Sequence, residues 1–293
     1  MKLYILFFTI FATDYEQEEL EKMANKVLFI TQEIIPYVSE SAMAQMGRTL
    51  PQAIQEKGRE IRTFMPKWGN VNERRNQLHE VIRLSGMNLI IDDTDHPLII
   101  KVASIQSARM QVYFIDNDDY FQQRLMKTDE NGEEYADNDE RAIFYARGVL
   151  ETVKKLRWCP EAIHCQGWIS ALVPLYIKKA YMDEPSFRDS KVIFSLFENT
   201  LASDLQENIV EKMLLKGIDK SEIEAIIPAH ATYKDLLKLA ISYSDGVIQH
   251  SEKVDPELLE YAKEKGIPVL EYQPTDDFAD AINQFYDKIW SQD

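Results

Sequence analysis

The turn after the first expected strand carries bulky and acidic side chains where a phosphate site would carry glycines. It spans residues 32–43 and reads QEIIPYVSESAM, with no glycine and with two carboxylates, Glu33 and Glu40. Backbone N–H groups reach phosphate oxygens only where no side chain intervenes, and a carboxylate repels an anion. No two glycines of the chain lie closer than 11 positions apart, the spacing of Gly47, Gly58 and Gly69. This spacing excludes both the G-x-G-x-x-G fingerprint and the P-loop.

The histidines and cysteines form no catalytic or metal-binding pattern. Histidine occurs at positions 79, 96, 164, 230 and 250, and these form neither the H-E-x-x-H nor the H-x-H motif of zinc hydrolases. The G-x-S-x-G motif of serine hydrolases is also absent from the sequence. Cys159 and Cys165 lack partners at metal-ligand spacing and are expected to be free thiols in a reducing compartment. His164 falls inside an expected strand and His250 at a strand end, where a core or rim histidine is the default. We expect no metal and no cofactor, and we assign no catalytic residue.

The densest polar region, residues 115–140, holds ten acidic residues against Arg124 and Lys127. A calcium loop needs oxygen ligands at alternating positions around a central Gly, and the run 129–134 does not keep that pattern. A solvated turn is therefore expected there. The run 137–141 begins a helix, and Asp137 or Asn138 can cap its free N–H groups.

The net charge of the chain limits which partners it can bind. The chain has 33 Lys and Arg against 49 Asp and Glu, a net charge of −16, which repels nucleic acid and excludes it as the main partner. A local basic excess consists of Lys57, Arg59, Arg62, Lys67, Arg74, Arg75 and Arg83. Two interpretations of it stay open: a solvated face, and a patch for an anionic metabolite or an acidic partner.

These residues are positioned by alternating strands and helices. Short apolar runs predict strands at 27–31, 60–65, 162–165, 191–197, 246–250 and 268–271. Helices are predicted at 41–57, 139–157, 168–181, 205–215, 233–242, 256–265 and 276–289. Three β-rich runs between residues 78 and 115 predict an antiparallel excursion. The pattern indicates an α/β fold, a Rossmann-like doubly wound and mainly parallel sheet with that excursion inserted.

In such a sheet ligands bind beyond the carboxyl ends of the strands. The loops after Thr31, Cys165, Phe197 and His250 are therefore where a site is expected. The last helix carries apolar residues at a spacing of three to four, at Phe278, Ile282, Phe285, Tyr286 and Ile289. It is predicted to dock on its own sheet, with a partner interface as the alternative.

Residues 25–293 are expected to form a single domain, because no low-complexity linker divides them. Residues 1–24 are expected to be an N-terminal extension ahead of the native start. Their apolar run 3–12 has the look of a short signal segment, but it is too short to span a bilayer, and acidic residues rather than an A-x-A site follow it. A cytoplasmic protein without a membrane partner is the favoured interpretation.

Three sequence blocks resemble bacterial glycogen and starch synthases. Residues 26–66 are similar to the family's opening pattern of Glu-x-x-Pro-Phe, Lys-Thr-Gly-Gly-Leu-Ala-Asp and Ala-Leu-Pro, matching it at Glu33, Pro36, Tyr37, Ala44, Leu50 and Pro51. Residues 135–151 resemble its Tyr-x-Asp-Asn-x-x-Arg-Phe helix start, and residues 158–174 its Trp-x-Pro-Asp-x-x-His-x-His-Asp-Trp segment. The resemblance implies a starch synthase N-terminal domain, one half of a GT-B glycosyltransferase that uses ADP-glucose.

The departures from the family pattern fall on its chemistry. Ser39, Ser41 and Ala42 stand where the family has its donor-binding lysine and paired glycines. Gln45 stands in place of the Asp that follows them, and Gln166 in place of the active-site histidine. The pair Asp137 and Asn138 is kept, and with Arg141 and Trp168 it is the expected ligand-binding set. The family's second domain, which supplies most of the nucleotide site, has no counterpart in the matched sequence.

We therefore expect a degenerate domain, a pseudoenzyme unable to transfer glucose alone, that binds a glucan or a sugar phosphate in a binding or regulatory role. One alternative is an active or split ADP-glucose-dependent glucosyltransferase in glycogen synthesis, completed by a protein partner that supplies a C-terminal domain. The other is a non-enzymatic interaction protein.

Overall fold

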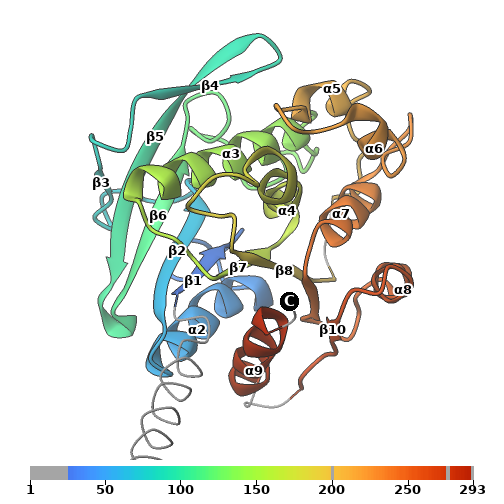
Figure 1. The fold of residues 1–293 in the computed structure, drawn as a ribbon. Coiled ribbons are helices and arrows are strands. Elements are labelled where there is room, and N and C mark those ends of the chain that lie inside the picture. The colour runs from blue at the N-terminus through green and yellow to red at the C-terminus, as the bar shows by residue number, and fades with distance from the viewer. Residues whose placement is uncertain (1–25, 199–200, 275–277, 292–293) are drawn as a thin grey trace, which may run out of the picture.

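The computed structural model describes residues 26–198, 201–274 and 278–291, which fold around a mainly parallel sheet (Figure 1). The strand order is β10-β9-β8-β7-β1-β2-β6-β5-β3. Its parallel part comprises β1 (Lys26–Ile30), β2 (Glu60–Pro66), β6 (Met110–Asp116), β7 (Ala162–Gln166), β8 (Lys191–Leu196), β9 (Gly246–Gln249) and β10 (Val269–Leu270). The predicted doubly wound sheet is confirmed.

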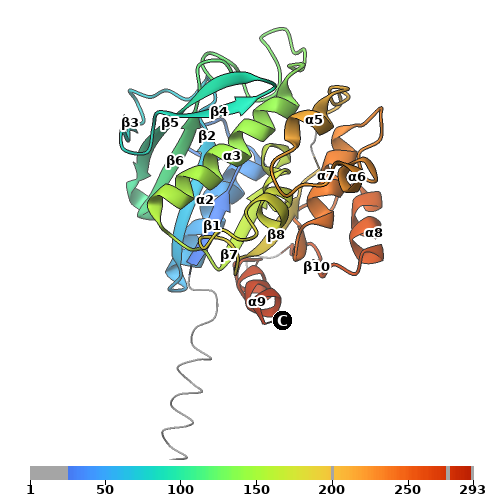
Figure 2. The ribbon, with the colours of Figure 1, turned by 45° about the horizontal axis from the view of Figure 1, so that its top comes forward.

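The antiparallel excursion is also confirmed. β5 (Thr94–Ile105) runs antiparallel to β6, and β3 (His79–Glu80) pairs with the far side of β5. β4 (Met87–Ile91) folds back on β5 as a hairpin, and Figure 2 shows it lying over α3 (Asn138–Leu156). Arg147 of α3 fixes this arrangement by donating a hydrogen bond of 2.5 Å to the carbonyl of Ile90.

Helices cover both faces of the sheet, and β1 shows how the sequence requires this. Val27 and Phe29 belong to one apolar core, and Leu28 and Ile30 to another. The first core lies under α2 (Ala42–Glu56) and α9 (Phe278–Trp290), and the second under α3, α4 (Val173–Leu175) and α7 (Tyr233–Ser242). Successive side chains of a strand point to opposite faces, so a strand covered on both sides must be apolar throughout.

The last helix docks on its own sheet, as predicted. Ala279, Ile282, Phe285, Tyr286 and Ile289 of α9 are all buried, the last four at 4 % exposure or less. Arg59 anchors the helix from the end of α2, with Nη2 2.6 Å from Oδ1 of Asp287. Lys57 pairs with Asp280 on the same helix.

Other members of the basic excess are also engaged inside the domain. Lys67 pairs with Glu73 at 2.9 Å, and the Arg62 guanidinium lies 5.0 Å from the ring centroid of Trp158. These contacts, with those of Lys57 and Arg59 to α9, tie neighbouring elements together. The four side chains therefore serve the fold rather than a binding patch.

Two predicted helices are wrong in extent. Residues 168–181 form a 3₁₀ turn (Trp168–Ser170), the single turn of α4 and a π-helical turn (Tyr176–Ala180) in place of one helix, with Pro174 inside it to restrict the hydrogen bonds. The helix predicted over 205–215 is reduced to α5 (Ile209–Met213). The preceding residues are held by distant parts of the chain: Asp204 forms a β-bridge with Thr232, and the N–H groups of Leu205 and Gln206 donate to Ala231 and Asp139.

The remaining elements lie beyond β8. α6 (Lys220–Glu224), which the sequence pattern did not predict, follows α5, and α8 (Pro256–Glu264) packs beside α7. Within the part of the chain that the structure describes, no helix has the length and apolar character needed to cross a bilayer. The expected extension, residues 1–24, lies outside the described residues.

Candidate functional site: a cleft at the carboxyl ends of the strands

A cleft of about 440 Å³ opens at the carboxyl ends of the central strands. It lies between the loops that follow β1, β7, β8 and β9, which is where the strand pattern predicts a site. Its lining residues are Gln32, Glu33, Ser41, Ala42, Met43, Met126, Lys127, Trp168, Phe197, Glu198, His250, Ser251 and Tyr272. We call this the main cleft.

Gln32 and Gly167 meet at the ends of the neighbouring strands β1 and β7, the switch point of the sheet. Gly167 has φ +83°, a left-handed conformation that favours glycine. A Cβ atom on Gly167 would lie 2.5 Å from Oε1 of Gln32, so a side chain there is excluded by space as well. Trp68 holds the Gln32 backbone by donating a hydrogen bond of 2.8 Å to its carbonyl. Gln32 is thereby fixed at the wall of the cleft.

The glycine-free turn is stabilised by its own side chains. Ser41 Oγ accepts a hydrogen bond of 2.9 Å from the N–H of Ala44, which caps α2, and donates one of 2.5 Å to the Glu33 carboxylate. The turn packs closely on the helix, because a Cβ atom on Gly47 would lie 2.0 Å from the Glu33 carbonyl oxygen. The amino end of α2 therefore presents a carboxylate and a side-chain cap, which disfavours an anionic ligand.

Several polar atoms at these strand ends are buried without a hydrogen-bond partner among the described residues. They are Oε1 of Gln32, both amide atoms of Gln166, Nε1 of Trp168 and Nε2 of His250. Gln32, Trp168 and His250 line the main cleft, and Gln166 ends β7 directly before Gly167. An unsatisfied buried polar group costs about 1–3 kcal/mol, so a cluster of them at one cleft needs an explanation.

A stack of three rings lies beside the main cleft. His250 stacks between Phe197, with ring centroids 5.0 Å apart, and His164, at 6.0 Å. His164 is buried and bonds through Nδ1 to the Tyr286 hydroxyl at 2.6 Å and through Nε2 to Ser195. Burial lowers the pKa of His250 to about 4, and burial together with the neighbouring His250 holds the pKa of His164 well below its ordinary value. Both rings are therefore neutral at physiological pH.

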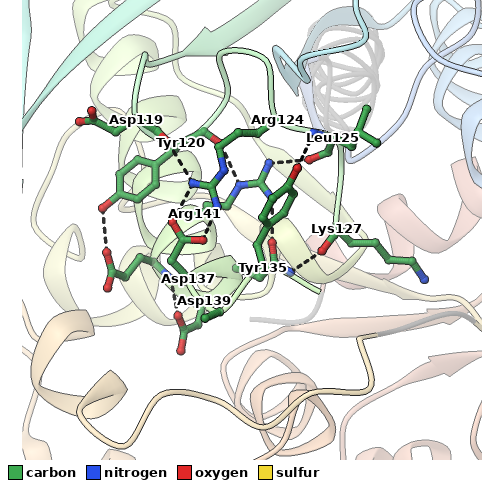
Figure 3. Close-up of polar contacts among 12 residues, drawn as sticks. Asp119, Tyr120, Arg124, Leu125, Lys127, Tyr135, Asp137, Asp139 and Arg141 are labelled. Carbon is green, nitrogen blue, oxygen red and sulfur yellow. Dashed lines mark hydrogen bonds and ion pairs between the residues drawn. The ribbon is translucent and has the colours of Figure 1, made fainter. Parts of the chain in front are cut away.

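The predicted helix cap at residues 137–138 is wrong, because Asp137 makes no side-chain capping bond. Its carboxylate pairs with Arg124 instead, with oxygens 2.5 and 2.8 Å from the guanidinium nitrogens (Figure 3). Burial would raise the pKa of Asp137, but the hydrogen bonds and charge of Arg124 outweigh it and lower that pKa. Arg124 lies 13 residues earlier in the chain, so local spacing did not reveal this partner.

Asn138 and Arg141 are fully buried and bind the chain itself. Arg141 donates to the carbonyls of Tyr120, Leu125 and Met126 at 2.9 Å each and to Oδ1 of Asn138 at 2.7 Å (Figure 3). Asn138 in turn donates to the Lys127 carbonyl at 2.9 Å. These side chains shape the loop that brings Met126 and Lys127 to the cleft wall.

The predicted ligand-binding set is thus divided by the structure. Trp168 lines the main cleft, while the side chains of Asp137, Asn138 and Arg141 act on the neighbouring loop. Among the predicted degenerate donor positions, Ser41 and Ala42 line the main cleft, Ser39 is exposed outside it, and Gln166 is buried at the end of β7. Gln45 lines an adjoining hollow.

Sequence reasoning missed Gln32, Glu198, Phe197 and Tyr272 as individual lining residues, although the loops that carry the first three were identified. Gln32 could have been found, because it directly follows the first strand, beside the switch point. The His164 and Tyr286 bond, across 122 positions, left no signal in the sequence. Among the described residues, no group of three or more His, Cys, Asp or Glu side chains is arranged to hold a metal ion.

Comparison with known proteins agrees with this geometry. The model of the starch synthase catalytic domain family matches residues 26–270. The glycogen synthase of Chlorobium limicola is 34 % identical over 230 residues, 76 % of this chain and 47 % of that protein. The glycogen synthase of Pelodictyon phaeoclathratiforme is 38 % identical over 197 residues, 67 % of this chain and 40 % of that protein. The chain therefore spans about half the length of the curated relatives it matches.

A solved structure shows the same fold. The catalytic domain of starch synthase IV from Arabidopsis thaliana, bound to ADP and acarbose, superposes with a TM-score of 0.68 at 15 % identity, covering 85 % of this chain and 51 % of that one. The sheet described above therefore has the architecture of part of a GT-B catalytic domain. With the match over residues 26–270, the chain belongs to the starch synthase catalytic domain family.

Proposed function

We propose that this domain binds a neutral α-glucan in the main cleft and does not transfer glucose by itself. The observation that carries the proposal is the cluster of unpartnered polar atoms at the strand ends, Gln32 Oε1, Trp168 Nε1, His250 Nε2 and the Gln166 amide. The cluster contains both donors and acceptors. A sugar hydroxyl both donates and accepts hydrogen bonds, so a glucan can satisfy both kinds.

The charge of the cleft favours a neutral sugar over a sugar phosphate or nucleotide. Glu33 and Glu198 line it, and Lys127 is the cationic side chain among its lining residues. Phosphate oxygens accept hydrogen bonds and carry negative charge, so they would meet carboxylates and the acceptor Gln32 Oε1. Phe197 and Tyr272 offer apolar ring faces to the C–H groups of a sugar.

The inability to transfer glucose rests on the residues at the donor positions. The family's lysine and paired glycines are replaced by Ser39, Ser41 and Ala42, and Ser41 caps α2 where a donor group would approach. Gln166 stands in place of the active-site histidine, and its amide cannot act as an acid or base. Removing one polarising group from such a site typically costs about 3–4 kcal/mol of transition-state stabilisation.

An active enzyme is the second candidate, in which a partner protein supplies the missing half. It is favoured by the neighbour from Arabidopsis thaliana, which is a catalytic domain bound to ADP and acarbose and about twice as long as the matched part. In this case the chain would contribute one wall of a shared site in the cytoplasm.

Isothermal titration of the chain with maltoheptaose, glucose 1-phosphate and ADP-glucose tests the proposal, together with transfer of labelled glucose from ADP-glucose to glycogen. We expect saturable binding of maltoheptaose alone and no incorporation of label. Incorporation by the pure chain would overturn the proposal in favour of an enzyme. Incorporation only with a co-purified partner would support the split enzyme, and silence toward all three ligands would indicate an interaction protein.

A single-residue variant ties the binding to the cleft. Trp168→Phe keeps the ring but removes the unpartnered indole N–H, and we expect maltoheptaose to bind about five- to tenfold more weakly, the loss of one hydrogen bond. Trp158→Phe is the matched control, because it removes an indole donor that bonds Glu60 away from the cleft. If Trp168→Phe binds maltoheptaose as tightly as the control Trp158→Phe does, the Trp168 indole N–H does not contact the glucan.

A further inference from the structure

A second hollow of about 400 Å³ continues the main cleft between α2 and α9. The two share the lining residues Ala42, Phe197, His250 and Tyr272, so they form adjoining lobes of one groove. We call the continuation the second lobe. Each lobe has the volume of a small-molecule site.

The chemistry of the second lobe differs from that of the main cleft. Among the residues that the structure describes, its lining includes no Asp, Glu, Lys or Arg. Polar atoms come from the amides of Gln45, Gln249 and Gln273 and from the Thr49 hydroxyl, set among apolar residues such as Met46 and Ile248. Amides and hydroxyls among apolar faces suit a ligand that is uncharged and alternates hydroxyl groups with C–H surface.

The outer wall of the second lobe is built by α9. Ile282 and Phe278 of this helix line the hollow, and the family match ends at residue 270, before the helix begins. α9 is held firmly, because Arg59 bonds Asn283 Oδ1 and Asp287 Oδ1 at 2.6 Å each. This wall is therefore a feature of the present chain rather than of the matched part of the family.

The same helix supports the ring at the junction of the lobes. Tyr286 of α9 bonds His164 at 2.6 Å, and His164 stacks on His250, which lines both lobes. An aromatic floor thus runs from one lobe to the other. Phe197, His250 and Tyr272 line both lobes, so a ligand can pass from one lobe to the other over these rings.

We propose that the second lobe is a subsite for additional sugar units of an extended glucan chain, with α9 as its outer wall. The proposal rests on the proposed glucan binding in the main cleft. It adds that affinity depends on chain length, and that residues of the second lobe govern this dependence.

Isothermal titration with maltose and maltoheptaose, on the full chain and on two variants, tests the second lobe. In Gln45→Ala/Gln273→Ala two amides of the lobe are removed, one from an exposed and one from a half-buried position, so we expect the fold to be retained. We expect the wild type to bind maltoheptaose at least about tenfold more tightly than maltose, and the double variant to lose most of that difference while binding maltose unchanged. Gln52→Ala, an amide on α2 that lines neither lobe, is the matched control.

The outcomes separate the two proposals. The proposed subsite in the second lobe would be overturned if the wild type bound maltose and maltoheptaose equally tightly, or if the double variant kept the length dependence. Glucan binding in the main cleft would then still stand. Absence of binding to either sugar would overturn glucan binding itself and the second lobe with it. Thermal unfolding of the double variant at the wild-type temperature excludes misfolding as the cause of a loss.

Discussion

Gln32 and Gly167 are fitted to each other: the space that a Cβ atom on Gly167 would occupy is 2.5 Å from Oε1 of Gln32. The pair joins the ends of β1 and β7 at the point where the sheet reverses its direction of winding. In the family pattern this glycine is an aspartate, whose side chain could not fit beside Gln32 as it lies here. The cleft therefore differs in shape from one that would hold an aspartate at this position.

Replacing Gly167 with alanine should destabilise the domain by about 2–4 kcal/mol, because the residue must hold φ +83° and displace Gln32. Gly86→Ala is the matched control, with φ +85° but nothing within 4 Å of the added Cβ. It should cost only the backbone strain, about 1 kcal/mol. Urea unfolding measures both values, and equal losses would show that the contact with Gln32 is unimportant.

Arg141→Lys should lower the free energy of unfolding by about 3 kcal/mol or more. The lysine ammonium cannot reproduce the guanidinium contacts with three backbone carbonyls and Asn138, and buried acceptors would be left unpaired. Arg75→Lys, an exposed position, should change stability by less than about 0.5 kcal/mol. Hydrogen exchange of the amides at 125–127 should accelerate in the first variant, and unchanged exchange would contradict a role in shaping that loop.

His250 should make the domain less stable in mild acid. Its pKa is about 4 in the folded protein and near 6.5 in the unfolded chain, so the unfolded chain binds more protons between these values. The stabilisation is complete above pH 6.5 and is lost as the pH falls toward 4. His250→Gln should reduce the slope of unfolding free energy against pH in this window, measured by urea titrations at pH 4.5, 5.5 and 7. An unchanged slope would assign the dependence to other groups.

Ser41→Ala should cost about 1 kcal/mol, since it removes the side-chain cap of α2 and the hydroxyl partner of Glu33. Ser39→Ala, two positions earlier and exposed, should be neutral. Circular dichroism during thermal unfolding distinguishes the two. If Ser41→Ala unfolds at the same temperature as the wild type, the Ser41 side chain does not stabilise the amino end of α2.

The positions of the parallel strands could be predicted because buried parallel strands leave a local pattern. The runs at Val27–Ile30 and Val192–Phe194 are apolar at successive positions, which marks them as covered on both faces. The position of the cleft followed from the same information, since the loops after β1, β7, β8 and β9 contribute to it. The ends of helices were harder to predict, because contacts with distant residues hold the neighbouring backbone. Before α5, for example, the N–H of Gln206 donates a hydrogen bond to Asp139, 67 positions away.

The details of the site could not be predicted, since they depend on partners distant in sequence. Asp137 has the residue type and position of a helix cap, yet the nearby Arg124 guanidinium offers its carboxylate two charge-assisted hydrogen bonds, which are stronger than one bond to a backbone N–H. Arg141 belongs to the expected ligand-binding set, and its side chain is fully buried among backbone carbonyls. The family pattern did not reveal which way these side chains face.

The alternation along β1 constrains how this strand can change over evolutionary time. Val27 and Phe29 fill one core and Leu28 and Ile30 the other, so inserting or deleting one residue in the strand would exchange every side chain between the two cores. Substitutions of similar volume at these positions are tolerable, whereas any change in length is not. The length of this strand is therefore fixed more strictly than its sequence.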